Sequence, residues 1–324
     1  MTKTVFPADF PEIRVQDELD RLIRENPELD PGYINTAGSF MLKPQRKLLE
    51  KLWPVYQPYA DPDFLKLMRS KDNFLSRTWE MVVAYALLEM GHKLEAKTSD
   101  KGPDSKIVSS DPAIWVEARS CTPGTGVDAV PELLHGVAQT LPMDEIVLRF
   151  GNAVFTKFRQ YESYLSAGLV HPNEPFVIAV SKGSINHPDS YPSAPLRYLF
   201  GVGNLTLRIP LNPETGKRET TDSFYAAQEP IAKKQGKEVP AGFFWNEAHA
   251  GVSAVIYCDN NVLNHPEPIG SDFVLLRNPL ASNPLPDNFF PRGVECVAQN
   301  GQIVCTDKGF VKSTDAFAYL NDCD

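Results

Sequence analysis

The sequence predicts an α/β protein in which helices flank a mixed central sheet and extra elements surround that core. Long segments carry apolar residues at helical spacing, short segments are rich in Ile, Val and Phe, and the two kinds follow one another in mixed order. With 324 residues, of which 42% are hydrophobic and 23% charged, the chain can bury a sizeable core.

Residues 1–72 are expected to form a helical N-terminal extension. The stretches "RVQDELDRLIREN" and "PQRKLLEKLWPVY" have the helical period, and prolines punctuate the segments between and after them. No chemistry is evident in this part of the chain. Residues 73–324 are expected to form the main α/β domain.

The main domain opens with the clearest amphipathic pattern, "NFLSRTWEMVVAYALLEMG", which predicts a helix that packs on a sheet and ends at Gly91. Three strands are expected next, at "HKLEAKTS", "SKIVSS" and "AIWVEARS". A second long helix is expected at "DEIVLRFGNAVFTKFRQYESYLSAG". The continuous apolar run "PFVIAVS" that follows is typical of a strand buried on both faces.

The C-terminal half is more elaborate. Residues 182–250 are rich in Pro, Ser, Asn and charged residues and read as a long insertion with one strand at "NLTLRIP". Two buried strands are expected at "GVSAVIYCD" and "DFVLLRNP", and residues 278–293 are expected to form an ordered loop.

Composition excludes some functions and compartments. The net charge of -9 disfavours a protein that coats nucleic acid, although it leaves room for a local groove beside a metal ion. No membrane association is expected, because no apolar run of about 18 residues occurs. The N-terminus lacks the pattern of a signal peptide, so a cytoplasmic protein is expected. The five cysteines are scattered and favour reduced, buried thiols over a disulfide framework or a structural zinc site.

Two acidic residues stand out within "GPDSKIVSSDPAIWVEARS". Asp104 begins one expected strand and Glu117 lies near the end of the next, so a hairpin would bring both carboxylates to one end of the sheet. Carboxylate oxygens are the ligands that Mg²⁺ prefers. Glu80, on the flank of the amphipathic helix, could reach the same place.

These residues resemble the motifs of the PD-(D/E)xK nuclease superfamily. The matching positions are Glu80, Gly102-Pro103-Asp104 and Glu117-Ala118-Arg119, in the order helix, strand, strand. The resemblance covers about residues 73–181, a third of the chain. It implies a restriction-endonuclease-like core, a Mg²⁺ or Mn²⁺ ion on Asp104 and Glu117, and cleavage of nucleic acid.

One position departs from the family pattern. The superfamily places a lysine where this chain has Arg119, and arginine stays charged and cannot act as a general base. Some members carry the lysine on a neighbouring element. Lys157 is the first candidate here and Lys106 the second. Lys157 shares a helix face with Gln160 and Tyr164, which resemble an additional motif of RecB-type nucleases.

Three functions therefore remain open. The first is a metal-dependent nuclease that Arg119 could impair, with Glu80, Asp104, Glu117, Arg119 and Lys157 as its site. The second is a catalytically degenerate module on the same fold that binds nucleic acid or a protein. The third is an enzyme whose site lies within residues 182–250. The ordinary alternative for the acidic residues is a turn aspartate, a solvent-facing strand glutamate and a salt-bridged helix glutamate.

Overall fold

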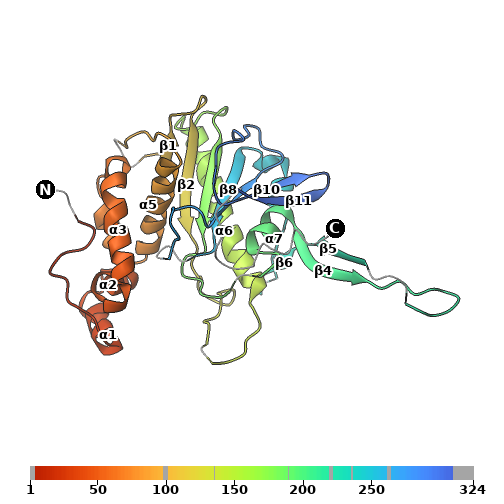
Figure 1. The fold of residues 1–324 in the computed structure, drawn as a ribbon, viewed down its shortest axis with the longest axis horizontal. Coiled ribbons are helices and arrows are strands. Elements are labelled where there is room, and N and C mark those ends of the chain that lie inside the picture. Colours follow the sequence, from red (N-terminus) through yellow and green to blue (C-terminus); the bar gives the residue numbers. More distant parts are fainter. Residues whose placement is uncertain are drawn as a thin grey trace.

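A seven-stranded mixed sheet forms the centre of the computed structural model, which describes residues 4–97, 101–134, 136–188, 190–218, 222–234, 236–260 and 264–308 (Figure 1). Its strands, in spatial order, are β1 (Ser105–Ile107), β2 (Ile114–Ser120), β3 (Phe176–Ser181), β8 (Val252–Cys258), β9 (Phe273–Arg277), β10 (Val294–Gln299) and β11 (Gln302–Asp307). β2, β3 and β8 run parallel to one another, as do β9 and β10, and the other neighbours are antiparallel. The predicted α/β class with a mixed sheet is confirmed.

Helices cover both faces of this sheet. Helix α5 (Phe74–Glu89) packs on one face, and α6 (Met143–Ser166) with α7 (Ala194–Phe200) packs on the other. Along β3, Val177 joins the hydrophobic cluster under α5, whereas Ile178 joins the cluster under α6. Because successive strand residues face opposite sides, a strand covered on both faces must be apolar throughout. This explains the continuous run in β3.

The N-terminal helices form a further layer outside α5 (Figure 1). They are α1 (Gln16–Glu25), α2 (Pro31–Gly38), α3 (Lys43–Tyr56) and α4 (Phe64–Arg69), with short 3₁₀ turns at Phe40–Leu42 and Gln57–Tyr59. Trp53 of α3 and Phe64 of α4 belong to the same hydrophobic cluster as Trp79 of α5. As a result α5 is buried on all sides between Thr78 and Leu87 rather than on one face alone.

One strand prediction needs correction, and one hairpin of the central sheet was not predicted. The strand expected at "HKLEAKTS" is wrong for its described residues, where Leu94 forms only an isolated bridge to Ile107; its last two residues, Thr98 and Ser99, lie outside the described part of the chain. The hairpin of β10 and β11, in contrast, was not expected. Its residues are mostly half-exposed, so it lacks the apolar run of a buried strand.

The cysteine prediction is wrong for one pair. Cys296 and Cys305 face each other across β10 and β11 and form a disulfide. Their separation of 9 residues is set by a tight turn, so the hairpin register alone brings the two thiols together. Cys121 and Cys258 are free and buried, as expected, and Cys323 lies outside the described residues.

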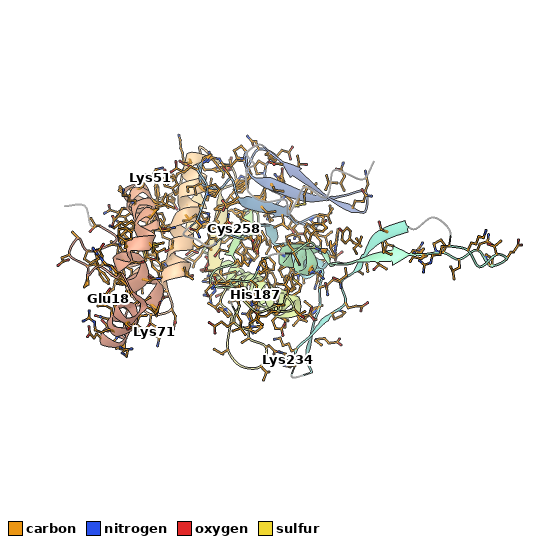
Figure 2. All side chains as sticks on the ribbon, turned by 60° about the horizontal axis from the view of Figure 1, so that its bottom comes forward. Glu18, Lys51, Lys71, His187, Lys234 and Cys258 are labelled. Atoms are coloured by element: carbon orange, nitrogen blue, oxygen red, sulfur yellow. A yellow bond between two sulfur atoms is a disulfide. The ribbon has the colours of Figure 1, made fainter. Side chains whose placement is uncertain are left out.

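Residues 182–250 contain α7 and two small hairpins. β4 (Val202–Arg208) pairs with β5 (Asp222–Ala227), and β6 (Ile231–Ala232) pairs with β7 (Glu238–Val239). The β4–β5 hairpin projects from the body as a long arm (Figures 1 and 2). The strand predicted at "NLTLRIP" is confirmed as β4. No helix within the described ranges combines the length and apolar character needed to cross a membrane.

Candidate functional site

The β1–β2 hairpin brings Asp104 and Glu117 together. Ser105 pairs with Val116 in the antiparallel register, so Asp104, one residue earlier, lies beside Glu117. The Asp104 backbone N–H donates to Glu117 Oε2 at 3.2 Å, and the Ala118 N–H donates to Asp104 Oδ2 at 2.7 Å. Each acidic residue thus helps to hold the other's strand. Their role as metal ligands remains a prediction.

Lys157 reaches this pair from helix α6. Its Nζ lies 2.5 Å from Glu117 Oε1 and also donates to Gln160 Oε1 at 3.0 Å. Gln160 in turn donates to the Tyr164 hydroxyl, which donates to Glu117 Oε2 at 3.4 Å. Residues 157, 160 and 164 share one face because the helix repeats every 3.6 residues. That face therefore presents a hydrogen-bonded row of side chains to a single carboxylate.

The ordinary alternative for Glu117 does not hold. Its side chain is 2% exposed, so it does not face solvent as a typical strand carboxylate would. A buried carboxylate is tolerated only where cations and hydrogen-bond donors compensate for the lost hydration.

Glu80 lies on α5, which covers the face of the sheet opposite to α6, and its charge interacts with that of Asp104. It is 4% exposed, accepts a hydrogen bond from the Tyr56 hydroxyl at 2.6 Å and forms an ion pair with Arg77 at 2.7 Å. Arg77 also contacts Asp61 at 3.1 Å. Within the described part of the chain Glu80 shares no hydrogen bond with Asp104, so the two acidic groups interact through their charges.

The N-terminal extension contributes two side chains to this network of hydrogen bonds and ion pairs. Tyr56 ends α3, and Asp61 lies between α3 and α4. Lys97, after α5, forms an ion pair with Asp61 at 2.9 Å. Arg77 could have been suspected from its spacing of three residues to Glu80, whereas Tyr56, Asp61 and Lys97 come together only through tertiary packing.

Burial and the negative charge of Asp104 raise the pKa values of Glu80 and Glu117. Burial, followed by the charge of Asp104, raises the pKa of Glu117 to about 7, although the nearby ammonium of Lys157 acts in the opposite direction. The same two causes raise the pKa of Glu80 to about 8, opposed by Arg77 and Lys97. Both carboxylates are therefore ionised less readily than in water, and a further cation beside them would favour their ionised forms.

The remaining candidate cations lie outside this cluster. Arg119 is exposed and, among the described residues, forms no hydrogen bond or ion pair with Asp104 or Glu117. Lys106 pairs with Glu95 at 3.2 Å. Of the lysines proposed to replace the one missing at 119, only Lys157 contacts the acidic pair.

The chain was compared with models of known protein families, with curated proteins and with solved structures. None of the three comparisons finds a match. The resemblance to the PD-(D/E)xK superfamily therefore rests on its short motifs and on the geometry described above.

The segment proposed to hold a separate site in residues 182–250 is tied together by aromatic packing. Phe243 and Phe244 are buried, and the His249 ring stacks on Phe243 with ring centres 3.8 Å apart. The Nδ1 atom of His249 also lies 2.8 Å from the Phe243 carbonyl oxygen. These contacts explain Phe243 and His249 as packing residues.

Proposed function

We propose that this chain is a metal-dependent phosphodiesterase that cleaves nucleic acid and is built on a restriction-endonuclease-like core. The observation that carries the proposal is the contact between Lys157 and Glu117. It supplies, from helix α6, the lysine that the motif lacks at Arg119. The order of α5, the β1–β2 hairpin and the parallel strand β3 agrees with such a core.

The donor set fits a hard divalent cation. Asp104 and Glu117 offer carboxylate oxygens from neighbouring positions of the hairpin. Mg²⁺ and Mn²⁺ favour such oxygen ligands. An ion bound there would polarise a phosphate oxygen and lower the pKa of a coordinated water.

The chain's own residues would then act around the phosphate. Lys157 is held within hydrogen-bond distance of Glu117 and can donate to a phosphate oxygen or to the attacking water. Tyr164 and Gln160 hold Lys157 and Glu117 in place through the hydrogen bonds described above. An ammonium positioned beside the phosphate stabilises the negative charge that develops in the transition state.

The same contact also supports the second candidate, a degenerate module that binds nucleic acid or a protein without cleaving it. Lys157 occupies Glu117 Oε1, an oxygen that a metal ion would otherwise use. If the ion pair outcompetes the metal, the site keeps its shape and loses its chemistry.

Cleavage assays separate the two. Single- and double-stranded DNA and RNA are incubated with Mg²⁺ or Mn²⁺ and with the wild type, Asp104→Asn, Glu117→Gln, Lys157→Met or the control Glu162→Gln. Glu162 lies on α6 but is half-exposed, away from the acidic pair. We expect cleavage by the wild type and the control only.

Two results would count against catalysis at this site. Cleavage that persists in both Asp104→Asn and Glu117→Gln places the reaction elsewhere. No cleavage of any substrate, together with no Mn²⁺ binding in calorimetry, favours the degenerate module.

A further inference from the structure

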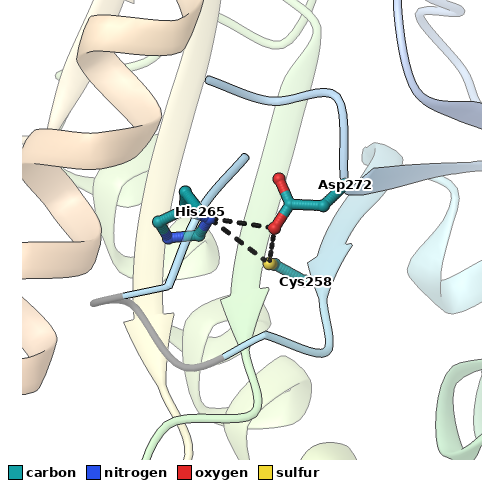
Figure 3. A group of neighbouring side chains, drawn as sticks. All are labelled: Cys258, His265 and Asp272. Atoms are coloured by element: carbon teal, nitrogen blue, oxygen red, sulfur yellow. Dashed lines mark hydrogen bonds and ion pairs between the residues drawn. The ribbon is translucent and has the colours of Figure 1, made fainter. Parts of the chain in front are cut away.

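A second cluster of metal-ligating side chains lies between β8 and β9, apart from the acidic site. Cys258 ends β8, Asp272 directly precedes β9, and His265 comes from the loop that joins the two strands (Figure 3). The antiparallel register pairs Cys258 with Phe273, so it sets the cysteine and the aspartate side by side. The connecting loop folds His265 back onto them.

The three ligating atoms converge tightly. Asp272 Oδ2 lies 3.2 Å from Cys258 Sγ and 2.9 Å from His265 Nδ1, and the sulfur and the nitrogen are 3.9 Å apart. For an ion at ordinary Zn–S, Zn–N and Zn–O distances of ~2.3, ~2.05 and ~2.0 Å, these separations give angles at the ion of roughly 125° for S–Zn–N, 95° for S–Zn–O and 90° for N–Zn–O. Such an ion fits above the plane of the three atoms. The angles suit a distorted tetrahedral site with a fourth position left over.

A fourth donor lies close by. The backbone carbonyl oxygen of Asn260 is 3.8 Å from Cys258 Sγ, and the Asn260 side chain donates to Asp272 Oδ2 at 2.9 Å. The Asn260 side chain thus orients the carboxylate, and its carbonyl oxygen is a candidate fourth ligand beside the sulfur. Outer hydrogen bonds of this kind commonly fix the ligands of a metal site.

Burial limits what else the cluster can do. The side chains of Cys258 and His265 are fully buried and that of Asp272 is 7% exposed. The His265 ring stacks on Trp79 with ring centres 6.2 Å apart, which holds it in the core. A cysteine nucleophile needs access to its substrate, so a Cys-His-Asp protease-like centre is excluded here.

The charge of the cluster also favours a cation. Among the described residues the only ion pair of Asp272 is with His265, and neither a lysine nor an arginine contacts it. A buried carboxylate that lacks a permanently charged partner is costly. A divalent ion with one thiolate and one carboxylate would leave the site neutral.

We propose that Cys258, His265 and Asp272 bind a zinc ion that fastens the β8–β9 loop to the core of the sheet. Thiolate and imidazole ligands favour Zn²⁺ over Mg²⁺, so this site and the acidic site differ in the metal that they select. On binding, the Cys258 S–H bond breaks, a Zn–S bond forms and the proton leaves to solvent. The imidazole binds through Nδ1 as a neutral ring, so the proton that Nδ1 donates to Asp272 in the metal-free form moves to Nε2.

The simpler explanation of the cluster is a hydrogen-bonded network in which the thiol and the imidazole donate to the carboxylate. Metal content separates the two. The full-length protein is stripped with a chelator, loaded with Zn²⁺ or Co²⁺, and passed through a desalting column. We expect about one tightly held ion per chain. The Co²⁺ form should show a thiolate-to-cobalt charge-transfer band and the intense visible bands of tetrahedral Co²⁺.

Variants then assign the site. Asp272→Asn and His265→Gln keep the size of the side chain and should lose the bound ion and the tetrahedral bands. Cys121→Ser is the matched control, because Cys121 is also a free buried cysteine but lies outside the cluster. The Cys121→Ser variant should keep the bound ion and the tetrahedral bands. Glu117→Gln should keep the zinc as well, so loss of cleavage and loss of zinc are separate results.

Three results would overturn the proposal. The wild type could hold no zinc and give only the weak spectrum of hydrated Co²⁺, which leaves the hydrogen-bonded network. The zinc could persist in folded Asp272→Asn and His265→Gln, which places it elsewhere. The charge-transfer band could be absent from cobalt-loaded wild type, which excludes Cys258 as a ligand. The first and third of these measurements use the wild type, so they do not depend on the folding of any variant.

Discussion

Replacing Lys157 with methionine should destabilise the protein by an amount that grows with pH. Lys157 stabilises the ionised form of Glu117, whose pKa burial and Asp104 have already raised to about 7. Without the lysine this pKa rises further, so the folded variant holds a proton above pH 7 that the folded wild type has released. In the unfolded state, Glu117 binds the same number of protons in the wild type and in the variant.

The sign and the size follow from proton linkage. A folded state that binds one extra proton loses about 1.4 kcal/mol of stability relative to the wild type for each pH unit above 7. The penalty from the lost ion pair should be small at pH 6 and on the order of 3 kcal/mol at pH 9. The raised pKa of Glu80 affects both proteins alike and cancels in the difference.

Urea denaturation followed by circular dichroism, at pH 6, 7, 8 and 9 in the presence of a chelator, measures this difference. Arg159→Met is the matched control, because Arg159 lies on the same helix and pairs with Glu162 at the surface. It should cost at most ~0.5 kcal/mol at every pH. Lys157→Met combined with Glu117→Gln should lose the pH dependence.

Equal penalties for Lys157→Met at pH 6 and pH 9 would refute the reasoning, because Glu117 would then not titrate against the lysine. So would a penalty at pH 9 no larger than that of Arg159→Met.

Three further predictions concern packing and covalent constraint. Tyr56→Phe removes the hydroxyl that donates to buried Glu80 and should cost about 1–3 kcal/mol in urea denaturation; an unchanged midpoint would mean that this hydrogen bond is not formed. Cys305→Ser opens the disulfide of the β10–β11 hairpin and should cost about 2–3 kcal/mol, whereas reduction of the wild type should lower its stability by a similar amount and leave the variant unaffected. Gly151→Ala adds a methyl group at 2.5 Å from the Tyr198 ring and should cost about 1–3 kcal/mol, although alanine normally favours a helix; a more stable variant would show that the ring can move away.

Local pattern was enough to predict the elements that build most of the core. Apolar residues at helical spacing predicted α5 and α6, and continuous apolar runs predicted β3, β8 and β9. The hairpin geometry also predicted that Asp104 and Glu117 would lie together. Helix periodicity alone placed Lys157, Gln160 and Tyr164 on one face. Each of these inferences needs only the repeat of a helix or the pairing of adjacent strands.

One missed element did carry a local signal. Asn300 and Gly301 both adopt positive φ angles at the turn between β10 and β11, and Asn-Gly is the strongest short sequence signal for a two-residue hairpin. The half-exposed strands on either side concealed it, because their residues alternate weakly in polarity.

The sequence by itself determined that α5 and α6 are helices, which strands are buried on both faces, and which carboxylate and lysine could meet around the first hairpin. Only the tertiary structure decided that Tyr56 and Asp61 of the N-terminal layer complete the acidic network, and that Cys258, His265 and Asp272 converge between β8 and β9. The physical reason is the sequence distance over which each kind of interaction acts. Periodicity and turn chemistry act over a few residues, whereas these contacts depend on how helices and loops pack against the sheet, and that packing is set by the shape of the whole core.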